Sequence, residues 1–188
     1  MDANPFTSRH VVVGVTGGIA AYKAAELVSR LRQRGADVTV VMTRAATRFV
    51  QPLTFAALTG KRVITDLFDP PDRYQADHVA LAQEADLAIV APATANFIGK
   101  AAAGIADDAL TTTILSLQCP IVVAPAMNHR MWAKQVVQQN LRRLRERGFH
   151  IVEPQEGWLA CGEVGIGRLA EVSAILEAAA ATLSPPQT

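Results

Sequence analysis

Four short runs of mostly apolar, β-branched residues are the feature that most restricts how this chain can fold. They lie at His10–Val15, Asp37–Met42, Leu87–Ala91 and Ile121–Ala124. Continuous apolar runs of this length are typical of strands that are buried on both faces. Segments long enough to form helices separate the runs. We therefore predict an α/β fold with a mostly parallel sheet and helices on both of its faces.

The remaining segments complete this alternating pattern. A helix is expected at 20–34, where Leu27, Val28 and Leu31 share one face and Gly35 stops the helix. The other expected elements are short helices at 45–50 and 52–58, a weak strand at 62–68, an exposed loop at 70–77, a long helix at 132–147, a last strand at 149–152, a mobile glycine-rich loop at 153–168 and a closing helix at 172–183. The sequence shows no internal repeat or boundary. We expect one domain over residues 8–183, followed by a linker or disordered tail at 184–188.

The composition of the chain excludes several classes of function. The formal net charge of the 188 residues is +1, and no basic cluster indicates a nucleic acid or an anionic membrane surface as partner. No apolar run approaches the ~20 residues that a membrane-spanning helix needs. The first residues show no basic region followed by an apolar stretch, and the two cysteines, Cys119 and Cys161, make no disulfide framework. We therefore expect a cytoplasmic protein.

A glycine-rich turn, GVTGGIAAYK at 14–23, lies between the first strand and the first helix. Glycines there let backbone N–H groups approach an anion at a helix N-terminus, although a tight turn without a ligand has the same pattern. The spacing of Gly14, Gly17 and Gly18 matches neither a Walker A loop nor the dinucleotide pattern G-x-G-x-x-G. The second strand is followed by Thr43, whose hydroxyl suits a phosphate, and not by an acid that would bind a ribose. A mononucleotide such as FMN therefore fits this turn better than NAD.

Two similar turns follow the third and fourth strands. APATAN at 91–96 and APAMN at 124–128 each place a proline at the end of the strand, then a small residue, and then an amide side chain. Small residues allow a flat ring to lie against the backbone, and Thr94 and Asn96 supply hydrogen bonds that would orient it. Either turn alone is equally well explained as a strand-to-helix turn, with Asn128 as a helix cap. All three turns follow parallel strands, however, and α/β sheets bind ligands in a crevice at the carboxyl ends of such strands.

His78 and Cys161 are candidates for proton transfer. Histidine is the residue type that exchanges protons near neutral pH, although a lone histidine such as His78 is more often a surface residue. Cys161 stands in a glycine-rich loop, where a thiol is either accidental or a reactive group that closes over a substrate. The sequence contains no CxxC, no HExxH and no clustered carboxylates, so we expect no metal site.

Taken in order along the chain, these segments resemble the flavin-containing cysteine decarboxylase family. They are GVTGGIAAYK, Thr43, His78, APATAN, PAMNHRMW and the ACGEVGIGR loop, and they extend over nearly the whole chain. Within the family, the chain is most similar to the phosphopantothenoylcysteine decarboxylase domains of bifunctional bacterial coenzyme A biosynthesis proteins. The resemblance implies a three-layer, Rossmann-like or flavodoxin-like fold. It also implies that FMN is held between the subunits of a homo-oligomer, either a trimer or a dodecamer of four trimers.

The resemblance further implies a role for individual residues. His78, Asn128 and Cys161 correspond to catalytic positions of the family, and Asn128 and Met131 correspond to substrate contacts. The residues implied to bind FMN come from the three turns and the end of the second strand: Gly17, Gly18, Thr43, Thr94, Ala95, Asn96 and Ala126.

The implied reaction converts 4′-phosphopantothenoylcysteine into 4′-phosphopantetheine. A carboxylate leaves readily only if the carbanion that remains has an electron sink, and cysteine itself offers none. Oxidation of the thiol to a thioaldehyde, with FMN as the oxidant, would create that sink. His78 would transfer a proton in the oxidation, and Asn128 would orient the carboxylate without a full charge pair. Cys161 would supply a proton when the enethiol is reduced again.

Other interpretations of the same segments stay open. The nearest is a peptidyl-cysteine decarboxylase of the lantibiotic type, which stops at the enethiol and has no need of Cys161. A flavin prenyltransferase would lack the combination of PAMN and the cysteine loop. A non-catalytic regulatory flavoprotein subunit would typically have lost one of His78, Asn128 and Cys161, and an electron carrier would need none of them. We also expect a phosphopantothenoylcysteine synthetase domain, either fused to the decarboxylase or separate from it.

Overall fold

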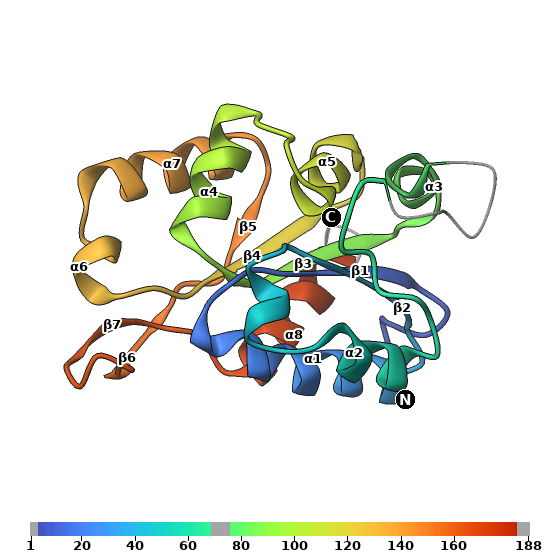
Figure 1. Ribbon diagram of the computed structural model, residues 1–188, viewed down its shortest axis with the longest axis horizontal. Coiled ribbons are helices and arrows are strands. Elements are labelled where there is room, and N and C mark those ends of the chain that lie inside the picture. Colours follow the sequence, from blue (N-terminus) through green and yellow to red (C-terminus); the bar gives the residue numbers. More distant parts are fainter. Residues whose placement is uncertain (1–3, 69–75, 184–188) are drawn as a thin grey trace.

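Five parallel strands form the central sheet of the computed structural model, which describes residues 4–68 and 76–183. Their order across the sheet is β2-β1-β3-β4-β5 (Figure 1). Their bounds are β1 His10–Val15, β2 Asp37–Met42, β3 Leu87–Ala93, β4 Ile121–Pro125 and β5 His150–Ile151. The prediction of a parallel sheet is confirmed, and the strand order is that of flavodoxin-like folds.

The direction of the strand order reverses at β1, which pairs with β2 on one side and with β3 on the other. The chain passes from β1 to β2 and then returns beyond β1 to β3, so the connections that leave β1 and β3 diverge at their carboxyl ends. In open α/β sheets, a ligand crevice lies at such a point. The topology therefore locates a binding site just beyond Val15 and Ala93.

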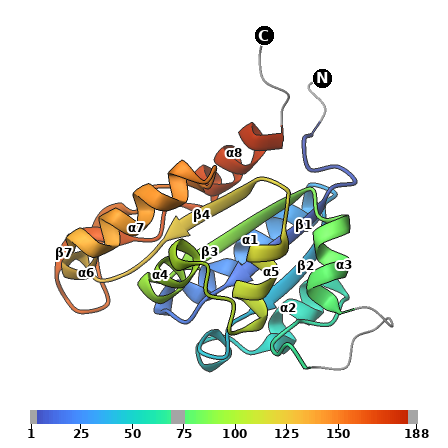
Figure 2. The same cartoon turned by 90° about the horizontal axis from the view of Figure 1, so that it is seen from above.

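Helices cover both faces of the sheet in two layers (Figures 1 and 2). One layer holds α1 Tyr22–Gln33, α2 Pro52–Thr59 and α8 Val172–Leu183, and the other holds α3 Asp77–Glu84, α4 Ala95–Ala103, α5 Ala109–Ser116 and α7 Gln135–Glu146. The side chains of β1 alternate between the two cores: Val11, Val13 and Val15 pack into the first, and Val12 packs into the second. Because both faces are covered, the strands carry apolar side chains at successive positions, as their sequences indicated.

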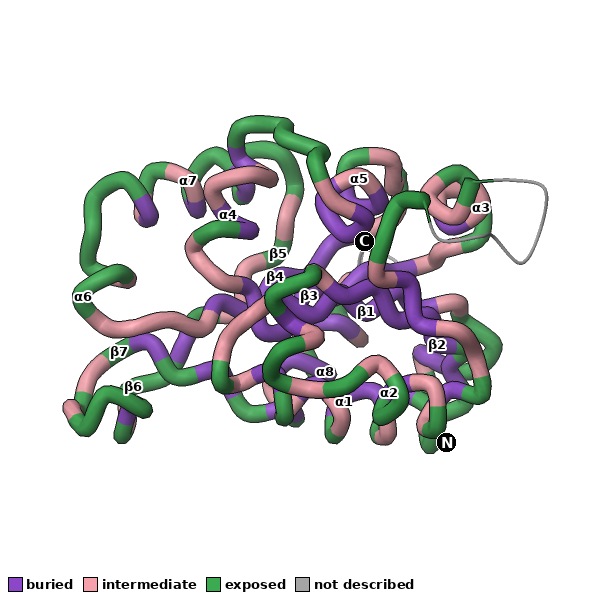
Figure 3. Tube along the Cα trace, viewed as in Figure 1, coloured by how far each residue is buried: buried purple, intermediate pink, exposed green. Residues whose placement is uncertain are grey.

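The segment at 153–168, expected to be a mobile loop, contains a β-hairpin instead. β6 Gln155–Trp158 pairs antiparallel with β7 Val164–Arg168, apart from the main sheet. Figure 3 shows the contrast in burial between this mostly exposed hairpin and the central strands. A hairpin whose residues are mostly exposed needs no regular apolar alternation, and its several glycines suggested a loop. For that reason the sequence pattern did not reveal it.

The long helix expected at 132–147 is two helices. The first, α6 His129–Trp132, ends before Lys134, whose extended backbone begins α7. The side chain of Gln138 reaches back across the break and donates a hydrogen bond from Nε2 to the Trp132 carbonyl at 2.7 Å. No glycine or proline marks the break, so the helical pattern in the sequence continues through it. The break leaves α6 free to pack against β7.

Several shorter segments also differ from expectation. The helix expected at 20–34 begins with a 3-10 turn, η1 Ile19–Ala21, and the short helix expected at 45–50 is only a 3-10 turn, η2 Ala46–Arg48. The weak strand at 62–68 reduces to a single bridge between Ile64 and Val41. Helices α3, α4 and α5 were not predicted. A signal for α5 was present, since Asp108 and Thr111 form a reciprocal capping box at its start.

Two expectations concern residues outside the described ranges. Most of the loop at 70–77 and the whole tail at 184–188 fall there. Within residues 4–68 and 76–183, no helix combines the length and the apolar character that crossing a membrane requires.

Candidate active site

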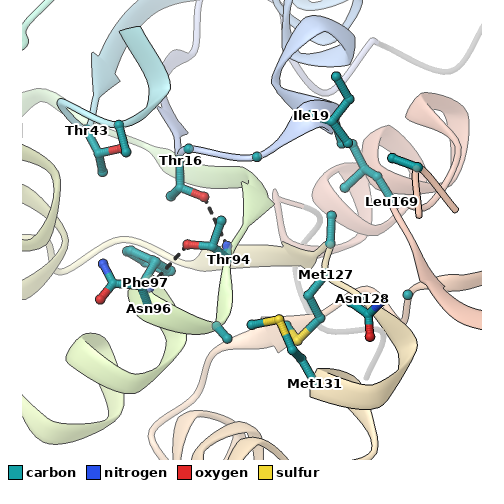
Figure 4. A pocket seen from close by; sticks show the side chains of 18 of the residues that line it. Thr16, Ile19, Thr43, Thr94, Asn96, Phe97, Met127, Asn128, Met131 and Leu169 are labelled. Atoms are coloured by element: carbon teal, nitrogen blue, oxygen red, sulfur yellow. Dashed lines mark hydrogen bonds between the residues drawn. The ribbon is translucent and has the colours of Figure 1, made fainter. Parts of the chain in front are cut away.

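A cavity of about 1110 Å³ lies where the topology locates a binding site, beyond the carboxyl ends of β1, β3 and β4. Ligand pockets commonly occupy about 300–1,000 Å³, so this cavity has room for a cofactor together with part of a substrate. Every candidate residue from the sequence except His78 lines it: Gly17, Gly18, Thr43, Thr94, Ala95, Asn96, Ala126, Asn128, Met131 and Cys161. Figure 4 shows the side chains of Thr16, Thr94 and Phe97 on one wall, with Met127, Asn128 and Met131 grouped on another.

Thr16 joins the turn after β1 to the turn after β3. Its buried hydroxyl donates a hydrogen bond to the Pro92 carbonyl at 2.7 Å and accepts one from the Thr94 N–H at 3.0 Å (Figure 4). One side chain of the turn after β1 thereby binds two backbone groups of the turn after β3, and the Thr16 N–H also donates to the Pro92 carbonyl, at 3.3 Å. The two predicted ligand-binding turns are consequently held at a constant separation.

Gly17 allows the turn after β1 to approach the turn after β2. A Cβ atom at Gly17 would lie 2.4 Å from the Ala45 Cβ atom and 2.8 Å from the Ala45 carbonyl carbon, closer than nonbonded atoms can be. Only glycine therefore permits this contact. Next to it, the Thr43 hydroxyl accepts a hydrogen bond from the Ala46 N–H at 3.2 Å, which leaves the hydroxyl proton available to a ligand.

The turns after β3 and β4 lie side by side. The Ala126 N–H donates a hydrogen bond to the Ala93 carbonyl at 3.0 Å, after an irregularity in the pairing of these strands. Thr94 caps α4 by accepting a hydrogen bond from the Phe97 N–H at 3.4 Å. The small side chains of Ala95 and Ala126 face the cavity here, as expected for a wall that receives a flat ring.

Asn128 links α6 to the β6–β7 hairpin. Its Oδ1 atom accepts a hydrogen bond from the Arg130 N–H at 2.8 Å, so the residue caps α6 as the alternative interpretation of the sequence proposed. Its Nδ2 atom donates a hydrogen bond to Cys161 Sγ at 3.3 Å, across 33 positions of sequence. Two candidate catalytic residues from distant segments are thus in direct contact.

Glycines bring the hairpin close enough for this contact. The Met127 N–H donates a hydrogen bond to the Gly167 carbonyl at 2.9 Å. Gly167 has φ +156°, and a Cβ atom there would lie 2.1 Å from the Met127 carbonyl oxygen. The hairpin therefore crosses the turn after β4 backbone to backbone, and Cys161 in the hairpin turn is carried to the cavity.

His129 and Glu163 also gather at this point, although the sequence patterns did not single them out. Glu163 Oε1 accepts a hydrogen bond from Arg130 Nη2 at 2.8 Å, and Cys161 Sγ donates one to Glu163 Oε2 at 3.7 Å. His129 Nδ1 lies 3.6 Å from the same Oε2 atom. No regular spacing relates residues of α6 to residues of the hairpin, so only the fold could reveal this cluster.

Charged side chains of both signs line the cavity. The basic ones are Lys23, Arg44, Lys100 and Arg168, and the acidic ones are Asp107 and Asp108. Lys100 Nζ lies 2.7 Å from Asp107 and 3.3 Å from Asp108. The hydrogen bond with Asp107 raises the pKa of Lys100 and lowers the pKa of Asp107, so this pair stays ionised near neutral pH.

His78 lies away from the other candidate residues. It is half-buried on α3, where its carbonyl accepts a hydrogen bond from Ser116 Oγ at 3.1 Å, and it does not line the cavity. Figures 1 and 2 show α3 at one end of the molecule and the β6–β7 hairpin at the other. Arg62 and Asp77 hold α3 in place, with Nη2 within 2.9 Å of both carboxylate oxygens. One copy of the chain therefore does not bring all the candidate catalytic residues together.

Comparison with known sequences gives consistent matches. A family model described as Flavoprotein matches residues 3–184. The chain is 51% identical over 172 residues to the coenzyme A biosynthesis bifunctional protein CoaBC of Bacillus subtilis (strain 168), covering 92% of this chain and 42% of that protein. It is 46% identical over 177 residues to CoaBC of Escherichia coli (strain K12), covering 94% and 44% respectively. The chain thus spans less than half the length of these curated relatives.

Solved structures also resemble it. The FMN-dependent cysteine decarboxylase SpaF superposes with a TM-score of 0.78 at 38% identity, over 93% of this chain and 99% of that one. A cysteine-to-serine mutant of PPC decarboxylase, complexed with pantothenoylaminoethenethiol, superposes with a TM-score of 0.81 at 30% identity, over 90% and 95%. Both likenesses cover nine-tenths or more of this chain.

Proposed function

The chain belongs to the flavoprotein family, among the flavin-containing cysteine decarboxylases, and from this premise we propose that it binds FMN and decarboxylates 4′-phosphopantothenoylcysteine to 4′-phosphopantetheine. The observation that carries the proposal is the contact between Asn128 and Cys161 beside a cavity with a glycine-rich end. That contact places an amide for a substrate carboxylate next to a thiol that can donate a proton. The relatives named for coenzyme A biosynthesis support this choice of substrate.

The residues of the cavity fit FMN. Gly17 exposes its backbone because it has no Cβ atom, which would collide with Ala45. The helical segment that begins after Gly18 has no side-chain cap. Uncapped N–H groups at a helix start favour an anion such as a phosphate. Thr43 adds a hydroxyl beside them, and Ala126 leaves space for a flat ring farther along the cavity. We assign the FMN contacts to Gly17, Gly18, Thr43, Thr94, Ala95, Asn96 and Ala126.

When bound, FMN supplies a two-electron acceptor for the substrate thiol and returns the electrons after carbon dioxide has left. Asn128 and Met131 would hold the substrate near the hairpin. The Asn128 amide orients the carboxylate by hydrogen bonding but does not stabilise its negative charge as an arginine would, and the charge is lost in the reaction. Asn128 therefore binds the substrate carboxylate without stabilising the ground state much more than the transition state.

Cys161 would serve the second half of the reaction. Its thiol donates a proton to the enethiol carbon skeleton as the electrons return, and Asn128 Nδ2 at 3.3 Å holds the sulfur at the rim of the cavity. The hairpin turn that carries Cys161 is exposed, so the thiol can close over a substrate after it has entered.

His78 would act in the cavity of a neighbouring copy. Within one chain it lies on α3, away from the cavity, yet the oxidation of the substrate thiol requires a proton acceptor. We therefore propose a homo-oligomer, a trimer or a dodecamer of four trimers, in which α3 of one copy faces the cavity of the next. Closed symmetry then supplies one histidine to every site.

The proposed function is tested with the purified protein and added FMN. We expect stoichiometric binding of FMN, loss of the yellow colour when 4′-phosphopantothenoylcysteine is added without oxygen, and release of carbon dioxide with a reduced thiol as product. Protein that binds FMN but releases no carbon dioxide would indicate a regulatory flavoprotein subunit instead. Protein that takes up no FMN would contradict both the decarboxylase function and the regulatory flavoprotein alternative.

Cys161→Ser is expected to retain FMN and to release carbon dioxide, but to accumulate the enethiol. A serine hydroxyl is a much weaker acid than a thiol, so proton delivery in the second half should slow by roughly 100-fold or more. Mass spectrometry distinguishes the products, because the enethiol is lighter than phosphopantetheine by two hydrogens. Cys119→Ser, at a half-buried thiol outside the cavity, is the matched control and should turn over normally. Full turnover by Cys161→Ser would remove Cys161 from the mechanism.

A peptidyl-cysteine decarboxylase is the second candidate, favoured by the 38% identity with the cysteine decarboxylase SpaF. It would release the enethiol as the final product from a peptide that ends in cysteine. Supplying the protein with such a peptide and with 4′-phosphopantothenoylcysteine in parallel separates the two functions. A synthetase domain, fused or separate, and a cytoplasmic location complete the proposal, in line with the bifunctional name of the relatives.

A further inference from the structure

Three side chains that can bind a metal converge from two segments beside the cavity. His129 begins α6, and Cys161 and Glu163 lie in the turn between β6 and β7. One imidazole nitrogen of His129, the thiol Sγ atom and a carboxylate oxygen all lie within 4.8 Å of one another. Nitrogen, sulfur and oxygen ligands in this combination suit zinc and similar divalent cations, whereas calcium and magnesium prefer oxygen alone.

Two of the three separations of these atoms lie close to the edges of a tetrahedral site. Zinc bonds of about 2.0–2.2 Å to nitrogen or oxygen and about 2.3 Å to sulfur place tetrahedral ligand atoms roughly 3.4–3.6 Å apart. The observed distances are 3.6 Å from His129 Nδ1 to Glu163 Oε2 and 3.7 Å from Cys161 Sγ to the same Oε2 atom. A small movement of the exposed hairpin turn would bring the third edge, between the His129 ring nitrogen and Cys161 Sγ, into the same range.

The His129 ring supplies a second observation, since its only close polar neighbour at Nδ1 among the described residues is the Glu163 carboxylate at 3.6 Å. Its Nδ1 atom is buried and has no hydrogen-bond partner among the described residues. β7 covers the ring so closely that a Cβ atom at Gly165 would lie 2.8 Å from His129 Cβ and 2.9 Å from His129 Cγ. A buried polar atom without a partner costs free energy, and a cation shared with the facing carboxylate would remove that cost.

Neighbouring side chains hold the other two ligands in place. Arg130 Nη2 donates to Glu163 Oε1 at 2.8 Å, which leaves Oε2 directed at the cluster. Asn128 Nδ2 donates to Cys161 Sγ at 3.3 Å, an interaction that also suits a metal-bound thiolate. Supporting hydrogen bonds of this kind orient the ligands of metal sites.

Contrary to the expectation from the sequence that there is no metal site, we propose that His129, Cys161 and Glu163 form a site for one zinc-class divalent cation, with water as the fourth ligand. The cation displaces the thiol proton to solvent, and no oxidation state changes. Because its ligands come from α6 and from the hairpin, the bound cation holds the hairpin closed against α6. It also occupies the sulfur of Cys161, so it would arrest turnover before the final proton transfer, a consequence that rests on the proposed function.

The site is tested by calorimetric titration of Zn²⁺ into the FMN-loaded protein, without substrate. We expect binding of one equivalent. His129→Gln, Glu163→Gln and Cys161→Ser should each weaken it at least tenfold, since even changes behind the ligands commonly cost about 10–100-fold in affinity. The matched controls are His150→Gln on β5 and Glu156→Gln on β6, both exposed and outside the cluster, and both should bind Zn²⁺ like the parent. Retention of FMN shows that each variant is folded.

Alkylation gives a second measurement. Iodoacetamide should modify Cys161 more slowly when Zn²⁺ is bound, and a chelator should restore the rate, as followed by mass spectrometry of the peptides. Cys119 is the internal reference, because burial raises the pKa of its thiol to about 11 and its slow reaction should not respond to Zn²⁺. Absence of binding, an affinity in the three ligand variants equal to that of the parent, or binding without protection of Cys161 would each overturn the site. Release of carbon dioxide by metal-free protein tests the proposed function separately.

Discussion

His78→Asn is expected to keep FMN bound and to lower the rate of flavin reduction by substrate roughly 100- to 10,000-fold, the usual contribution of a positioned acid or base. Asparagine is similar in size and retains a hydrogen bond, but its amide cannot take up a proton near neutral pH. The rate is measured as the anaerobic loss of the yellow colour after mixing with substrate. His150→Asn, the same change at an exposed histidine of β5, is the control and should react like the parent.

Because His78 lies away from the cavity of its own chain, mixing two variants tests whether each site is shared between copies. If each site combines His78 of one copy with Asn128 of another, two inactive variants should complement each other when they assemble together. Asn128→Asp should be inactive because its carboxylate would repel the carboxylate of the substrate. For random mixing of His78→Asn and Asn128→Asp, about a quarter of the sites would contain both native residues, and activity should return to about that fraction. Mixed assemblies that stay inactive would place His78 and Asn128 in one chain's site. Normal bleaching by His78→Asn alone would remove His78 from the chemistry.

Gly17→Ala is expected to weaken FMN binding by at least tenfold, equivalent to about 1.4 kcal/mol. The added Cβ atom would lie 2.4 Å from Ala45 Cβ, so the turns after β1 and β2 must separate, and with them the proposed phosphate contacts at Gly18 and Thr43. Crowding of this kind should also lower the free energy of unfolding by about 1–3 kcal/mol. FMN titration by fluorescence and thermal unfolding without FMN measure the two effects separately.

Gly99→Ala is the matched control for this substitution. Gly99 lies within α4, where a Cβ atom would be 3.7 Å from Asn140 Nδ2, an ordinary contact. Alanine is favoured over glycine in a helix by up to about 1 kcal/mol, so this variant should be at least as stable as the parent. If Gly17→Ala binds FMN as tightly as Gly99→Ala does, the close approach to Ala45 has no part in holding the ligand.

Local patterns were sufficient for the sheet but not for every helix. The four apolar runs became β1, β2, β3 and β4, because strands covered on both faces need apolar side chains at successive positions. Helix α5 was missed although Asp108 and Thr111 mark its start, and α4 was missed because its first residues looked like the continuation of a binding turn. The break between α6 and α7 carries no glycine or proline and had no sequence signal.

The layered α/β fold and the three turns that converge at one edge of the sheet follow from the residue pattern alone, because the pattern of burial and the ends of strands are local properties. Which distant side chains meet depends on how the helices and strands pack in three dimensions. Cys161 reaches Asn128 because the glycines of β7 let the hairpin cross the turn after β4 at backbone distance, and the same crossing brings Glu163 to His129. The packing also places His78 apart from them, on a helix at the other end of the molecule. Contacts across long stretches of sequence depend on how whole elements pack, and no local periodicity encodes that.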